Sequence, residues 1–123
     1  MYCFIIAGRA KVNKELVLGK VVPSRKCAYV ACAGHEIKVT EYEILTDPND
    51  LLSWKSTGTV GAIPFGAKKG GHDGRDMVYF IARAEAPDGS LCCGRYVPQD
   101  RRCYYPWNGQ ELSAVNFEFL CKK

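Results

Sequence analysis

Apolar and aromatic residues gather along this chain in short runs, which glycine, proline and charged residues separate. The runs are rich in β-branched and aromatic side chains, which favour strands. No stretch has the i, i+3, i+4, i+7 spacing of an amphipathic helix, and residues 49–55 are expected to form at most one helical turn. The pattern predicts an all-β fold with strands at residues 2–7, 17–22, 27–33, 77–82, 92–97 and 102–107.

A further strand is expected after each of two glycine turns, and its apolar phase changes partway along. Ile37 and Val39 alternate with polar residues, but the apolar positions then move to Tyr42 and Ile44. The same change occurs within residues 111–120. Because one extra residue turns the following side chains to the opposite face of a strand, we interpret this change as a β-bulge in both strands.

The chain matches itself at an offset of 75 residues. Nine of the 30 positions in residues 16–45 are identical in residues 91–120, with no gap, which indicates an internal tandem duplication. It predicts two pseudo-symmetric antiparallel β units, each a sheet of about four strands, linked through residues 46–60. The identical pairs are Leu16/Leu91, Gly19/Gly94, Val22/Val97, Pro23/Pro98, Tyr29/Tyr104, Gly34/Gly109, Glu36/Glu111, Glu43/Glu118 and Leu45/Leu120.

The length of 123 residues fits a single compact domain, residues 1–123. Within it we place a first, N-terminally shortened repeat at residues 2–46 and a second repeat at residues 54–121. Residues 54–76 precede the second copy and have no counterpart in the first. This segment is rich in glycine, but it lacks the Gly-Lys-Ser/Thr ending of a phosphate-binding loop.

Composition narrows the function classes. Hydrophobic residues make up 47% and charged residues 24%, as in an ordinary globular domain. A net charge of +4 is too small to indicate nucleic-acid binding. No apolar run approaches the roughly 20 residues of a membrane span, and no signal peptide is recognised, so a cytoplasmic location is expected, with non-classical release left open.

Cysteine usage favours reduced thiols over disulfides or a metal site. The count is odd, two cysteines are adjacent, no CxxC occurs, and neither His35 nor His72 is spaced as a metal ligand. We therefore expect cysteines that pack as small hydrophobic residues, and neither a metal nor another cofactor. The seven are Cys3, Cys27, Cys32, Cys92, Cys93, Cys103 and Cys121.

An enzyme is not expected from these residues. No nucleophile–base arrangement can be assembled around either histidine. Glu36 and Glu111 could be drawn as a carboxylate pair for glycoside hydrolysis. Their equivalence in the repeat favours matched binding or structural positions over distinct acid and base roles.

Several short motifs occur in an order that resembles the DM-nine repeat. The second copy carries Gly70-Gly71-x-Asp73, Tyr79-x-x-Ala82-Arg83-Ala84 and Gly94-Arg95, and the first carries Gly8-Arg9-Ala10 and Gly19-Lys20-Val21. The resemblance implies tandem β-rich units with pseudo-twofold symmetry. Some mollusc members are calcium-independent, mannose-specific lectins of innate pattern recognition. Others, in insects and flatworms, are intracellular proteins that respond to infection.

The resemblance implies a carbohydrate-binding protein for mannose-type glycans, and a non-lectin interaction or infection-response protein as the alternative. In the lectins, the aspartate of Gly-Gly-x-Asp and the lysine of Gly-Lys-Val are the sugar-contacting pair. Here these positions are Asp73, Lys20 and, with arginine in place of lysine, Arg95. A carboxylate accepts from sugar hydroxyls while a cation donates to their oxygens. The first copy has no aspartate of its own to pair with Lys20, so three interpretations stay open. Only one site is complete, or Lys20 pairs with Asp73 across the pseudo-dyad, or it pairs with an aspartate of a partner subunit.

Other residues have both a structural and a binding interpretation. Glu36 and Glu111 follow glycine turns, where they could support the turn or contact sugar. Trp54 and Trp107 could stack on a sugar or pack in the core. Weak single-site sugar binding gains from multivalency, so a homodimer is expected. Glu43 and Glu118 are expected to pair with arginines, Arg9 and Arg83 respectively, and so close each unit.

Overall fold

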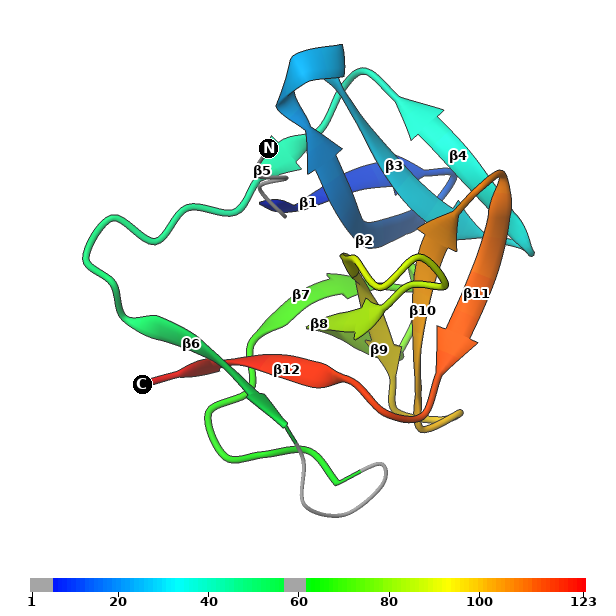
Figure 1. The fold of residues 1–123 in the computed structure, drawn as a ribbon. Coiled ribbons are helices and arrows are strands. Elements are labelled where there is room, and N and C mark those ends of the chain that lie inside the picture. Colours follow the sequence, from blue (N-terminus) through cyan, green and yellow to red (C-terminus); the bar gives the residue numbers. More distant parts are fainter. Residues whose placement is uncertain (1–5, 57–61) are drawn as a thin grey trace.

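The computed structural model describes residues 6–56 and 62–123, and these residues form one 12-stranded sheet (Figure 1). A 3-10 turn, η1 (Pro23–Arg25), follows the second strand. The all-β prediction is confirmed. The strands are β1 (Ile6–Val12), β2 (Glu15–Val22), β3 (Cys27–Cys32), β4 (His35–Val39), β5 (Glu43–Ile44), β6 (Leu52–Ser56), β7 (Lys69–His72), β8 (Val78–Glu85), β9 (Leu91–Val97), β10 (Arg102–Trp107), β11 (Gln110–Ala114) and β12 (Glu118–Lys122).

The internal duplication is visible in the strand order. The sheet runs β5-β1-β2-β3-β4-β11-β10-β9-β8-β12-β6, so β1–β5 and β8–β12 repeat one arrangement in mirror order about the β4–β11 junction. The two units, linked through residues 46–60, were predicted as two related sheets, whereas the structure joins them in one sheet. The sheets are continuous because β4 pairs with β11, where His35 lies opposite Gln110.

The predicted bulge in the last strand of each copy is also wrong. The chain bends at residues 40–42 and again at residues 115–117, and each expected strand divides into two. β4 pairs with β3, whereas β5 pairs with β1, and β11 and β12 divide in the same way. The apolar phase changes because the two halves pack against different neighbours, not because an extra residue is inserted.

The segment before the second copy supplies two further strands. Residues 52–55 lie in β6, which pairs with β12, so the helical turn expected over residues 49–55 does not form. Both carboxylate oxygens of Asp47 instead accept backbone N–H groups, from Leu51 at 2.8 Å and Leu52 at 3.0 Å. β7 pairs with β8 and touches β2, where His72 lies opposite Leu16. Most of the first predicted strand, residues 2–5, lies outside the described residues.

Each copy has its own core, and a third cluster lies between them. The second copy packs four aromatic rings, and the first packs smaller aliphatic residues around Val17 and Val30. The cluster between the copies includes Leu18 of the first and Ile81 of the second. The aromatic residues are Phe80, Tyr96, Phe117 and Phe119, with ring centroids 4.8–6.4 Å apart.

The cysteines within the described residues pack in the core, as predicted. All six are buried, and each carries a free thiol. Burial raises the pKa of Cys92 to about 11 and that of Cys93 to about 12. Cys3 lies outside the described residues. In the described part of the chain, no helix is long and apolar enough to cross a membrane.

Two equivalent glycines let adjacent strands approach closely. A Cβ atom on Gly19 would overlap the carbonyl oxygen of Tyr29, and one on Gly94 would overlap that of Tyr104. Gly34 has a φ of +85° in a turn with open space around it. At Gly19 and Gly94 the neighbouring backbone leaves no room for a side chain. At Gly34 a side chain would fit, but the left-handed backbone conformation disfavours it.

We predict that Gly94→Ala lowers the free energy of unfolding by about 3 kcal/mol, because the neighbouring backbone must move to admit the methyl group. Gly34→Ala should lower it by only about 1 kcal/mol, the cost of a left-handed conformation. Urea unfolding of both variants measures the difference. Equal losses of unfolding free energy in the two variants would contradict the close approach of Gly94 to the carbonyl of Tyr104.

Candidate functional site

Two cation–carboxylate pairs lie beside the junction of the copies. Lys20 of β2 pairs with Glu36 of β4, with Nζ and Oε2 3.5 Å apart. Arg95 of β9 pairs with Glu111 of β11, with a guanidinium nitrogen and Oε2 2.9 Å apart. Both members of the second pair are 75 positions after those of the first. The structure therefore brings four of the five predicted site residues into two equivalent pairs.

Each glutamate also supports the glycine turn of the opposite copy. The N–H of Gly109 donates to Glu36 Oε1 at 3.1 Å, and the N–H of Gly34 donates to Glu111 Oε1 at 3.2 Å. The backbone N–H groups of the same glutamates donate to the carbonyls of these glycines, at 3.1 and 3.0 Å. The structural interpretation of the glutamates is thus supported: each carboxylate joins its own copy's cation to the other copy's turn.

The two cations cross the junction in the same way. Lys20 Nζ donates to the carbonyl of Pro106 at 3.1 Å, and Arg95 donates to the carbonyl of Ala31. Pro106 and Ala31 are themselves equivalent positions in the repeat. Both cations therefore bond a strand of the opposite copy, which fixes where their charges lie.

Aromatic rings flank each cation. Lys20 Nζ lies 5.7 Å from the ring centroid of Tyr29 and 5.3 Å from that of Trp107. The guanidinium carbon of Arg95 lies 5.3 Å from the centroid of Tyr104 and 5.1 Å from that of Tyr79. These distances fall in the range of cation–π attraction.

These tyrosines were not predicted as site residues from the sequence. The identity of Tyr29 and Tyr104 in the repeat, at positions directly opposite Lys20 and Arg95, is the signal that could have found two of them. Tyr79 lies outside the matched segment and carries no such signal.

The two sites differ in their access to water. The side chain of Lys20 is 21% exposed and that of Arg95 is 10% exposed. Tyr79 covers Arg95, and its hydroxyl donates to Glu15 Oε1 at 2.7 Å. Burial, more than this hydrogen bond, raises the pKa of Tyr79. The Arg95 site is closed by protein groups, whereas the Lys20 site stays partly open.

Asp73 lies in the turn between β7 and β8. Its Oδ1 accepts the N–H of Arg75 at 2.8 Å and that of Met77 at 3.2 Å, so the carboxylate holds its own turn. The turn follows β7, whose Gly71 lies opposite Tyr79, the residue that covers Arg95. Lys20 forms its ion pair with Glu36 and not with Asp73.

The expected arginine–glutamate pairs that close each unit are confirmed. Arg9 Nε lies 3.1 Å from Glu43 Oε1, and Arg83 Nε lies 2.8 Å from Glu118 Oε1. Trp54 packs against the second pair, with its ring centroid 4.4 Å from the guanidinium carbon of Arg83. Trp54 is therefore half-buried against its own chain. Within residues 6–56 and 62–123, no three His, Cys, Asp or Glu residues group as metal ligands.

The difference in burial predicts different costs for removing the two glutamates. Glu111→Ala should lower the free energy of unfolding by about 3 kcal/mol, because Arg95 would remain buried without its carboxylate. Glu36→Ala should cost about 1 kcal/mol, since Lys20 can reach water. Chemical denaturation of both variants tests this order. A Glu36 variant as unstable as the Glu111 variant would contradict the open character of the Lys20 site.

Comparison with known proteins places the chain in a family. A search of the curated proteins finds no match. The family model of the DM9 repeat matches residues 4–89 and again residues 76–123. The two matches overlap and together extend from residue 4 to residue 123, so the chain belongs to the DM9 repeat family.

Proposed function

We propose that this protein binds carbohydrate of the mannose type without calcium, at the Lys20 site. The observation that carries the proposal is a partly exposed lysine–glutamate pair bordered by the rings of Tyr29 and Trp107. DM9 family membership is consistent with a carbohydrate-binding or related role. Pattern recognition in innate immunity is the biological role that fits such binding.

The Lys20 site has the donors and acceptors that a sugar needs. An ammonium group has three N–H donors, and in Lys20 one is directed at the carbonyl of Pro106 and one faces Glu36. The third can donate to a sugar oxygen. The carboxylate of Glu36 has acceptor capacity beyond the Gly109 N–H and Lys20, and it can accept a hydrogen bond from a sugar hydroxyl. Two neighbouring hydroxyls can thus be held without a metal.

An aromatic wall complements these polar groups. A pyranose has an apolar C–H face, and an indole ring offers an apolar surface of matching size. Trp107 lies beside Lys20 and is only half-buried. Cys32 occupies the equivalent position of the first copy, so the Arg95 site lacks this wall.

We assign the Arg95–Glu111 pair to the fold and not to ligand binding. Its cation is covered by Tyr79 and donates to Ala31, and its carboxylate holds the turn at Gly34. Asp73 is assigned to its own turn in the same way. One sugar site per chain follows. A binding protein is favoured over an enzyme because Glu36 and Glu111 hold matched positions and not distinct acid and base environments.

A glycan array in the presence of EDTA, with the reduced chain, tests the proposal. We expect selective mannose-type signal, and a loss of about 10-fold or more in affinity for Lys20→Met, since a hydrogen bond to a charged group contributes about 1.5–3 kcal/mol. Lys11→Met is the matched control, because Lys11 is an exposed lysine on another strand, β1. Asp73→Ala should retain binding if it folds.

A blank array, with the fold confirmed by circular dichroism, would reject the lectin proposal and favour a protein-interaction or infection-response role. Sugar binding that survives Lys20→Met but is lost in Asp73→Ala would move the site to the Arg95 side of the molecule. Thermal unfolding of each variant separates lost binding from lost structure.

A homodimer belongs to the same proposal, because one weak site per chain needs a second to hold a multivalent glycan. Light scattering at the concentration used for binding should give two chains per particle. One chain per particle would contradict the dimer while leaving the sugar site untouched.

A further inference from the structure

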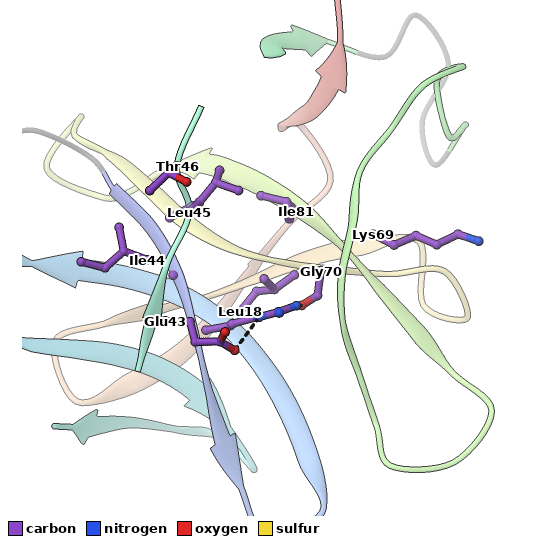
Figure 2. A pocket seen from close by; sticks show the side chains of 11 residues that line it. Leu18, Glu43, Ile44, Leu45, Thr46, Lys69, Gly70 and Ile81 are labelled. Carbon is purple, nitrogen blue, oxygen red and sulfur yellow. Dashed lines mark hydrogen bonds and ion pairs between the residues drawn. The ribbon is translucent and has the colours of Figure 1, made fainter. Parts of the chain in front are cut away.

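A hollow of about 280 Å³ lies between the two copies, on the side of β1 and β5 (Figure 2). Its apolar lining comes from Leu18 of the first copy, Ile81 of the second, and Ile44 and Leu45. Arg9 and Glu43 form its polar wall, and the carbonyl of Gly70 accepts from Arg9 at 2.9 Å. Lys69 points away from the hollow (Figure 2).

The second copy shows what fills the equivalent place. Arg9 and Glu43 correspond to Arg83 and Glu118, and there the ring of Trp54 lies 4.4 Å from the guanidinium carbon. Trp54 is delivered by β6, which pairs along the outer edge of β12 with Trp54 opposite Leu120. In the first copy, β5 takes the part of β12. Among the described residues, β5 pairs with β1 alone and ends the sheet.

The missing cover changes the exposure of equivalent residues. The side chain of Glu43 is 70% exposed against 31% for Glu118, and that of Arg9 is 39% exposed against 20% for Arg83. Ile44 is 49% exposed, whereas its counterpart Phe119 is fully buried. The first copy thus presents an apolar residue, a fixed guanidinium and a strand edge that the second copy covers.

We propose that this hollow binds an aromatic side chain, an indole above all, carried by an extended segment of a partner protein that pairs with the outer edge of β5. Arg9 is held in plane by Glu43 and Gly70, so the face of its guanidinium is left to stack on a ring. Main-chain hydrogen bonds to β5 supply affinity, as in other cases of strand addition.

The charge of the hollow defines the segment further. In the β6–β12 pair, Ser56 lies two residues after Trp54 and opposite Glu118. The corresponding residue of a docked segment would lie opposite Glu43, whose carboxylate is largely exposed. Opposite charges in such cross-strand positions attract. The partner segment should therefore contain an aromatic residue and, two positions later, a lysine or arginine. This inference does not depend on sugar binding.

The test is a titration of the full, 15N-labelled chain with the capped peptide Leu-Leu-Ser-Trp-Lys-Lys, followed by amide chemical shifts. Shifts are expected at Gly8, Ile44 and Gly70, which line the hollow. Replacing the peptide's tryptophan by alanine should weaken binding at least 10-fold. Replacing its last lysine by glutamate should weaken binding about 5-fold, because that residue lies opposite Glu43.

Two variants of the protein make the test specific. Arg9→Met should weaken the peptide at least 5-fold, while Lys11→Met, an exposed cation on the same strand, should leave it unchanged. Glu43 is exposed, and Glu43→Gln should remove the difference in affinity between the peptide that ends in lysine and the one that ends in glutamate. This second variant tests the site even if Arg9→Met fails to fold.

Four results would overturn the proposal. The first is the absence of shifts around the hollow at millimolar peptide, and the second is equal binding of the alanine peptide. The third is a set of shifts centred on Lys20 and Trp107 instead. The fourth is a change at Gly8 and Ile44 that follows protein concentration without peptide, since a second copy of the chain would then be the occupant.

Discussion

The structure depends on the reciprocal contact between the glycine turns of the two copies. Each turn offers a backbone N–H to a glutamate of the other copy, and each glutamate returns its own N–H to the opposite glycine carbonyl. Because one strand from each copy meets here, two small sheets become one. The same glutamates hold Lys20 and Arg95, so the contact that joins the copies also positions both cations.

The repeat gives the Lys20 and Arg95 sites equivalent residues, and residues 54–76, which precede the second copy, make the surroundings of the two sites different. β7 and the turn at Asp73 come from that segment. They lie beside β8, whose Tyr79 covers Arg95, and the hydrogen bond from Tyr79 to Glu15 ties this cover to the first copy. Trp107 stands at the position where the first copy has Cys32, which gives Lys20 an aromatic wall. Equivalent cations thus acquire a buried structural role and a partly exposed one.

Much of this could be predicted from sequence, since identity at a fixed offset carries pairing information. The repeat indicated the β units, the equivalence of Glu36 and Glu111, and the pairs of Arg9 and Arg83 with glutamates. The continuous sheet could not be predicted, because alternation gives a strand's faces but not its neighbours. The sequence also cannot distinguish a bulge from a break in residues 36–45. A strand with one inserted residue and a strand that divides into two give the same change of apolar phase. The lysine–glutamate pairing depends on the register of β2, β3 and β4, which alternation along the chain does not supply.

The asymmetry between the copies has one further consequence. Residues 52–56 cover the arginine–glutamate pair of the second copy, and β7 lies beside the strand that covers its cation site. In the second copy, Trp54 thus packs against Arg83, and β7 lies beside the strand whose Tyr79 covers Arg95. In the first copy, by contrast, both Lys20 and the Arg9–Glu43 pair remain accessible. A duplication in which one copy encloses its cations and the other leaves them accessible separates stability from recognition, and it centres both proposed binding surfaces on cations of the shorter repeat.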